Sequence, residues 1–151
     1  MQLLADTNIL LRLLQRSDPD HGLVRSTLRH LRERGEQVCF APQNLVEFWR
    51  VCTRPASANG FGLTVAKTDQ RARVIERLFT ILPDGPAVHA EWRRLVVAHS
   101  VSGVQVHDAR LVALMRVHGL RVLLTFDVAD FGRYPGVSAV HPQDAGVLKE
   151  P

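Results

Sequence analysis

The chain has 151 residues, of which 46% are hydrophobic and 23% charged, a composition that suits one globular domain and argues against disorder. No apolar run approaches the roughly 20 residues that cross a bilayer, and the first residues carry no basic leader, so we expect a cytoplasmic protein without a membrane anchor. The net charge is +4 and all but two of the 19 basic residues are arginines, which permits a polyanionic partner such as nucleic acid.

The first third of the chain reads as strands alternating with helices, because short apolar runs alternate with stretches of helical period. Thr7 and Asn8 are expected to cap the first helix, and Pro42 suits the first turn of the third. Residues 54–62 contain the longest stretch of turn formers and should form an exposed, mobile loop. The expected elements are a strand over 2–6, a helix to 14, a helix over 20–34, a strand over 37–41 and a helix over 42–53.

The rest of the chain continues the alternation. Thr64 is expected to cap a helix with Val74, Ile75, Leu78 and Phe79 on one face. The expected elements are a helix over 64–80, a short strand over 81–82, helices over 86–99 and 106–118, a strand over 121–124 and an edge strand over 138–140. This order predicts an α/β fold: a parallel sheet of four to five strands with helices on both faces, in a single domain over 1–151.

Four carboxylates lie where apolar runs stop or are interrupted: Asp6, Asp108, Asp127 and Glu47. The carboxyl ends of parallel strands meet at one edge of a sheet, so these side chains should lie close together. Two carboxylates 4 Å apart repel by roughly 4 kcal/mol at an effective dielectric near 20. A cluster of them therefore raises its own pKa values or binds a cation, for which Mg²⁺ or Mn²⁺, as one or two ions, is the natural choice.

Each acid also has a purely structural interpretation. The three aspartates lie near helix starts or turns, where a carboxylate caps backbone amides. Glu47 can pair with Arg50 on the surface of its helix. A coincidence of four acids, each at a strand end or on the helix that follows, is however less expected than one shared site. The candidate supporting residues are Thr7, Asn8, Thr125 and Asp130, for which helix capping or a turn is the alternative.

Four segments carry a resemblance to a known family. They are LLADTNILLRLL at the start, PQNLVEFWRV in the third helix, HDARLVAL in the last helix and LLTFDVADF near the end. In this order and over nearly the full length, the chain resembles PIN-domain ribonucleases, and among them the VapC-type toxins of prokaryotic toxin–antitoxin pairs. The resemblance implies strand order 3-2-1-4-5, a homodimer, and a VapB-type antitoxin whose tail occupies the active site. It also implies a metal-binding quartet, namely Asp6, Glu47, Asp108 and Asp127.

We therefore predict a Mg²⁺- or Mn²⁺-dependent endoribonuclease that acts as a toxin. Arg50 and Arg54 follow Glu47 on the third helix and are candidate contacts for the RNA backbone, with a solvated helix face as the alternative. Three other functions compete: a PIN-like module that binds RNA or protein without cutting, a PIN nuclease of RNA processing, and a phosphatase of the haloacid dehalogenase type. The phosphatase needs an aspartate two residues after Asp6, where this chain has Asn8.

Overall fold

The computed structural model describes residues 1–147, and its five strands form one parallel sheet. The strands are β1 (Gln2–Ala5), β2 (Gln37–Phe40), β3 (Thr80–Ile81), β4 (Val122–Leu124) and β5 (Ser138–Val140). Their order across the sheet is β3-β2-β1-β4-β5, so the expected α/β fold and strand order are confirmed. Residues 148–151 of the domain expected over 1–151 lie outside the described part.

β1 is the central strand, and its side chains are buried on both faces of the sheet. Leu3, Leu4 and Ala5 have no exposed surface. Leu4 lies beside Cys39 of β2 and Leu123 of β4, which are also fully buried. The strand order reverses at β1, the position at which open α/β sheets usually bind their ligands, beyond the carboxyl ends of the strands.

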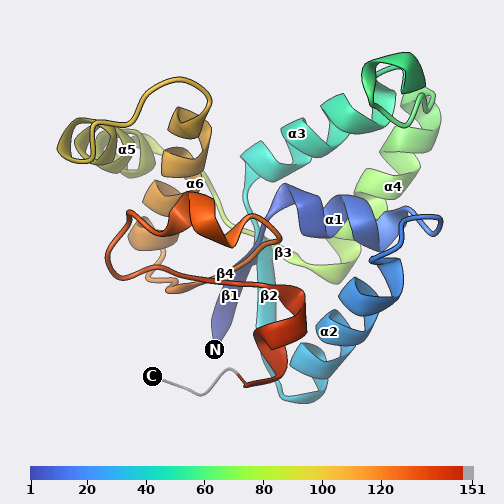
Figure 1. Ribbon diagram of the computed structural model, residues 1–151, viewed down its shortest axis with the longest axis horizontal. Helices are drawn as coiled ribbons and strands as arrows, with labels where there is room; N and C mark the ends of the chain where they lie inside the picture. The colour runs from blue at the N-terminus through green and yellow to red at the C-terminus, as the bar shows by residue number, and fades with distance from the viewer. Residues whose placement is uncertain (148–151) are drawn as a thin grey trace.

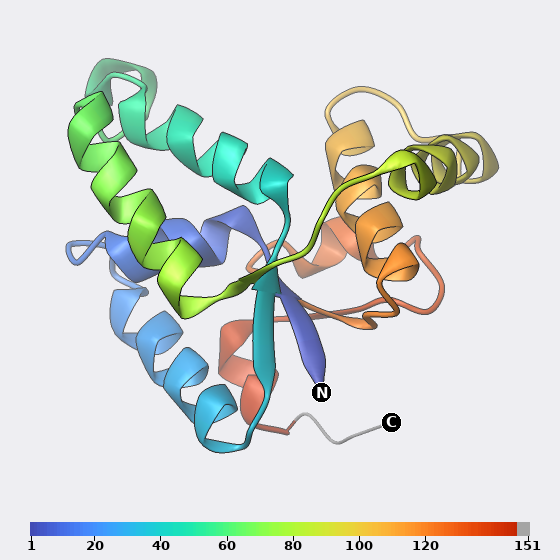
Figure 2. The same ribbon diagram turned by 180° about the vertical axis from the view of Figure 1, so that it is seen from behind.

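Helices cover both faces of the sheet, as expected (Figures 1 and 2). Those in residues 1–147 are α1 (Thr7–Leu14), α2 (His21–Glu33), α3 (Pro42–Thr53), α4 (Val65–Leu78), α5 (Pro86–Ala98) and α6 (Gln105–Val117). α5 and α6 share one apolar core with the sheet, whereas α1 to α4 pack in a second core on the opposite face. Over the same residues, no helix is both long and apolar enough to cross a membrane.

Two connections differ from the expectation. The residue that caps α1 is Asp6, whose carboxylate accepts the Thr7 N–H, because the chain turns into the helix one residue earlier than expected. The 54–62 loop is exposed, but it is not a structureless segment. It contains a short 3₁₀ helix (Ala56–Ala58), and the N–H groups of Phe61 and Leu63 donate back to carbonyls of α3. These hydrogen bonds attach the loop to the end of the helix that carries Glu47.

The apolar face of α4 is narrower than expected. Thr64 caps the helix as expected, accepting the N–H of Lys67, and Ile75 is buried. Val74 and Leu78, however, are 38% and 53% exposed, so only part of this apolar face is buried. The reason lies in the sheet edge: β3 has only two residues and begins one residue earlier than expected, which leaves little sheet surface for α4 to cover.

Candidate active site

Asp6 stands at the carboxyl end of β1 and begins the site. Its Oδ1 accepts the backbone N–H of Thr7 at 2.7 Å, and its Oδ2 accepts the hydroxyl of Thr125 at 2.7 Å. The pKa of Asp6 is raised to about 6, mainly by burial; the hydrogen bonds from Thr125 and Thr7 oppose this rise, and the like charges of Glu47 and Asp127 add to it. A buried carboxylate that shares its surroundings with two others is in a position to bind a cation.

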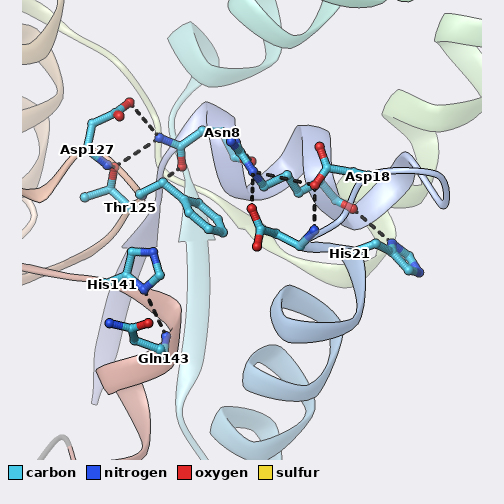
Figure 3. Close-up of polar contacts among 10 residues, drawn as sticks. Asn8, Asp18, His21, Thr125, Asp127, His141 and Gln143 are labelled. Atoms are coloured by element: carbon cyan, nitrogen blue, oxygen red, sulfur yellow. Dashed lines mark hydrogen bonds and ion pairs between the residues drawn. The ribbon is translucent and has the colours of Figure 1, made fainter.

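Asn8 connects the start of α1 to the turn after β4 (Figure 3). Its Nδ2 lies 3.3 Å from Asp6 Oδ2, 3.2 Å from Thr125 Oγ1 and 3.0 Å from Asp127 Oδ2. Its Oδ1 accepts the backbone N–H of Phe126 at 3.2 Å. A neutral amide therefore bridges two carboxylates that are 121 positions apart in the chain, and both are candidate ligands.

Glu47 approaches the same place from α3. Its Oε2 accepts the Thr7 hydroxyl at 2.7 Å, and its Oε1 accepts the amide of Gln43 at 2.9 Å. The Gln43 amide also donates to the backbone carbonyl of His107 at 3.0 Å, so it ties α3 to the first turn of α6. The alternative in which Glu47 pairs with Arg50 is wrong, because the partners of Glu47 are Thr7 and Gln43.

Asp108 lies in the first turn of α6 and is half-buried. Within residues 1–147 its carboxylate makes no hydrogen bond and no ion pair, so both oxygens remain open. Its pKa is raised to about 6, first by burial and then by the charges of Asp6, Asp130, Glu47 and Asp127, in that order. The carboxylates therefore act on one another electrostatically, and we call these five residues the acid cluster.

The acid cluster suits a hard divalent cation by its chemistry, because it offers oxygen donors and excess negative charge. Within the part of the chain that the structure describes, however, no group of three or more His, Cys, Asp or Glu side chains already has a metal-binding arrangement. The hydrogen bonds explain this, because the Asn8 amide occupies the space between Asp6 and Asp127. The donor set fits a hard cation by its chemistry, and binding requires these side chains to rearrange.

The structure therefore brings together most of the candidate residues, namely Asp6, Thr7, Asn8, Glu47, Asp108, Thr125, Asp127 and Asp130. The two arginines are not part of the cluster. Arg50 is exposed on α3, and Arg54 is half-buried and donates to the carbonyl of Asn59 in the 54–62 loop at 2.8 Å.

Sequence reasoning missed two polar residues of α3. Gln43 holds Glu47, although a hint was present: it lies one turn before Glu47 on the same helix stripe. Asn44 is fully buried; its Oδ1 accepts the N–H of Ala41 and its Nδ2 donates to the Thr7 hydroxyl. A buried asparagine at the start of an apolar helix could have drawn attention to this position, since a buried amide needs partners.

Comparisons with known proteins agree with this fold. Over residues 3–137 the chain matches the PIN domain family, whereas no curated protein sequence matches it. The crystal structure of VapBC2 from Rickettsia felis bound to a promoter DNA fragment aligns with a TM-score of 0.69 at 12% identity, over 93% of this chain and 98% of that chain. A toxin–antitoxin complex from Klebsiella pneumoniae aligns with a TM-score of 0.63 at 22% identity, over 93% of this chain and 97% of that chain.

A third similar structure is Mycobacterium tuberculosis VapC20, named as a toxin that cleaves the sarcin-ricin loop. It aligns with a TM-score of 0.63 at 18% identity, over 85% of this chain and 92% of that chain. At such identities the likeness establishes a common fold and no more.

Proposed function

This chain belongs to the PIN domain family, and from that premise we propose that it is a Mg²⁺- or Mn²⁺-dependent endoribonuclease and the toxin of a VapBC-type toxin–antitoxin pair. The observation that carries the proposal is the acid cluster, in which the pKa values of both Asp6 and Asp108 are raised to about 6. RNA is the proposed substrate because the net charge of +4 favours a polyanion and because VapC20, which has the same fold, is named as a toxin that cleaves the sarcin-ricin loop.

We propose Asp6, Asp108 and Asp127 as the metal ligands. A bound divalent cation would lower the pKa of a water molecule and neutralise charge on the phosphate oxygens. Asp108 is the most available ligand, since its oxygens have no partner within residues 1–147. Glu47 is held through both oxygens, by Thr7 and Gln43, which orients it to accept a proton or to hold the metal. Thr7, Asn8 and Thr125 support the carboxylates, and Asp130 adds negative charge beside Asp108.

A groove between α2 and α4 supports the proposal of a protein partner. Its volume is about 1380 Å³. The apolar residues that line it include Leu13, Leu14, Leu28, Leu63, Val74, Leu78 and Phe79, and the cationic ones are Arg16, Arg25, Arg29, Arg32, Lys67, Arg71 and Arg77. Its one acidic lining residue, Glu36, is already paired with the N-terminus. An antitoxin segment with apolar and acidic side chains would complement this surface, while a basic residue of its tail would suit the acid cluster.

Three further assignments belong to the same proposal. Arg50 and Arg54 are proposed RNA contacts, and Arg50 is the more available because Arg54 already bonds to its own loop. A homodimer is proposed, and the exposed side chains of Val46 and Val104 offer apolar surface for a second copy. Cytoplasmic residence agrees with the two buried cysteines, neither of which forms a disulfide.

One observation favours a second candidate, a PIN-like module that binds without cutting. The Asn8 amide bridges one oxygen of Asp6 and one of Asp127, so it holds the two carboxylates together without a metal. A PIN nuclease of RNA processing is a further alternative; it would cleave RNA by the same metal-dependent chemistry but would have no antitoxin. The phosphatase has less support, because Asn8 stands where its second aspartate belongs and serves there as a donor.

The test of the proposed function is RNA cleavage with Mg²⁺, with EDTA, and by the variants Asp6→Asn and Asp108→Asn. We expect cleavage only with metal, and a loss of about 10³-fold in kcat/KM in each variant, because a metal ligand contributes several kcal/mol to transition-state stabilisation. Asp69→Asn is the matched control, since this carboxylate pairs with Arg73 on the surface of α4. Equal cleavage in EDTA would refute the metal mechanism, and tight RNA binding without cleavage would favour the binding module.

A further inference from the structure

We infer that Arg12 is a positioning residue of the active site: by stacking on Phe126 it holds the turn after β4, and with it Asp127, against α1. The inference rests on the proposed function in that it treats Asp127 as a metal ligand. Arg12 lies in the last turn of α1 and is not part of the acid cluster, so its contribution is indirect.

The turn that carries Asp127 depends on contacts made by its neighbours. Asp127 is exposed, and its carboxylate is held by the Asn8 amide. The backbone N–H of Thr125 donates to Val140 in β5, which anchors the start of the turn to the sheet. Beyond that anchor, the N–H of Phe126 donates to Asn8 Oδ1. The position of the Asp127 carboxylate thus follows the position of Phe126 relative to α1.

Arg12 and His141 hold the side chain of Phe126 from two sides. The guanidinium carbon of Arg12 lies 4.1 Å from the centre of the Phe126 ring, a cation–π contact. The ring of His141 meets it edge-on at 4.8 Å with an interplanar angle of 82°. The hydroxyl of Thr125 and the carboxylate of Asp127, on either side of Phe126 in the chain, both contact Asn8. The Phe126 ring contacts Arg12 instead. The turn is therefore clamped to α1 by a polar contact on one side and a stacked one on the other.

Arg12 is itself held in place, which a positioning residue requires. Its Nη1 donates to the backbone carbonyl of Asn8 at 3.2 Å. Its Nε lies 3.8 Å from Asp18 and 3.5 Å from Asp20, in the turn that leads to α2, and Figure 3 includes Asp18 in this network. Both distances are those of ion pairs without a hydrogen bond, and among the described residues the buried Nε has no hydrogen-bond partner. The hydrogen bond to Asn8 therefore fixes the guanidinium, and it does so through the same residue that bridges the carboxylates.

The test compares Arg12→Leu, Arg12→Lys and Phe126→Leu with the wild type, with Arg73→Leu as control. Arg73→Leu also removes an arginine paired with an aspartate, but on the far surface of α4. The first readout is the Mn²⁺ dissociation constant from electron paramagnetic resonance without RNA, and the second is the kcat and KM of cleavage. Thermal unfolding identifies the temperature range in which every variant is folded.

We expect Arg12→Leu to weaken Mn²⁺ binding and to lower kcat by about 10-fold each, the size seen when residues that support metal ligands are removed. KM should change less than about 3-fold, since RNA contacts are unaffected. Arg12→Lys should recover part of the loss, because it keeps the charge but not the planar stack. A double variant, Arg12→Leu with Phe126→Leu, completes the set; its Mn²⁺ affinity should fall no further than that of the weaker single variant, since both residues act through one contact.

Unchanged Mn²⁺ affinity in a folded Arg12→Leu protein would overturn the inference and leave the nuclease proposal intact. If the wild type failed to cut RNA while Arg12→Leu still weakened Mn²⁺ binding, the nuclease proposal would fall and the inference would stand. A variant that only unfolds at lower temperature, with the metal constant of the wild type, would reduce Arg12 to a structural residue. If Arg12→Leu does not fold, Arg12→Lys and Phe126→Leu decide by the same metal titration.

Discussion

Asp6 and Asp108 both have a pKa raised to about 6, yet they reach it in different ways. Asp6 is almost fully buried, at 8% exposure, and its hydrogen bonds from Thr125 and Thr7 offset part of the effect of burial. Asp108 is half-buried, and beyond burial all the other influences on it are like charges. Hydrogen bonds from the protein therefore stabilise the charge of Asp6, whereas no hydrogen bond within residues 1–147 stabilises the charge of Asp108.

This difference indicates how the two residues divide the work of the proposed site. A carboxylate with three donors has a defined position and few free lone pairs, so it suits the fixed part of a metal site. A carboxylate without donors gains most from a cation, because the cation replaces repulsion by attraction. Binding energy should therefore come mainly from Asp108, and geometry mainly from Asp6.

The largest expected effect is on the stability of the metal-free protein as a function of pH. Both folded pKa values lie above the ordinary 3.8, so the native state holds more protons than the unfolded state between about pH 4 and 6. The stability that these protons provide is present below pH 4 and is lost as the pH rises through 6. For Asp6 it amounts to about 3 kcal/mol, and for the half-buried Asp108 to less, because water screens its charge.

Urea unfolding in EDTA at pH 5 and pH 7.5 checks this, with Asp108→Asn as the comparison that removes one of the two groups. The difference in the free energy of unfolding between the wild type and Asp108→Asn should grow above pH 6. An equal free-energy difference at both pH values would show that burial and like-charge repulsion do not raise the pKa of Asp108.

The next effect separates the two acids directly, at pH 7.5 and without metal. Asp108→Asn should stabilise the protein by about 1 kcal/mol, because it removes a charge that is partly buried and repelled by its neighbours, and it breaks no hydrogen bond among the described residues. Asp6→Asn should not, since an amide would turn its NH₂ toward the donors of Thr7, or of Thr125 and Asn8. Thermal unfolding in EDTA measures both. A stabilised Asp6→Asn protein would mean that these hydrogen bonds contribute less than charge.

The smallest effect concerns the hydrogen bond from Thr125 to Asp6. Thr125→Val removes the hydroxyl at nearly constant volume and should raise the pKa of Asp6 by about one unit, since a hydrogen bond to a carboxylate is worth about 1.5 kcal/mol. Thr125→Ser keeps the hydroxyl and should leave that pKa near 6. Carbon-13 NMR titration of the carboxyl carbons distinguishes the two variants. The same pKa in both would remove this hydrogen bond from the explanation.

Local sequence was sufficient for the elements and for the position of the acids. β1, β2, α1 to α3 and the cap at Thr64 follow from apolar period and capping residues, and the structure has them within a residue or two. Asp6 and Asp127 were placed together because parallel strands end at the same edge of a sheet. The width of the apolar face of α4 was not predictable in this way, because it depends on how much sheet lies beneath the helix.

The sequence by itself determined that carboxylates would gather beyond the central strands, since strand ends and helix starts are local properties. Only the tertiary structure decided which of their oxygens are in use. The register of β1 against β4, with Ala5 beside Leu124, brings Asn8 and the Asp127 turn together. Such contacts join residues more than a hundred positions apart, and a hydrogen bond depends on tenths of an ångström that no sequence pattern specifies. Hence the negative charge of the site could be predicted from the sequence, whereas the hydrogen-bond partners of its carboxylates could not.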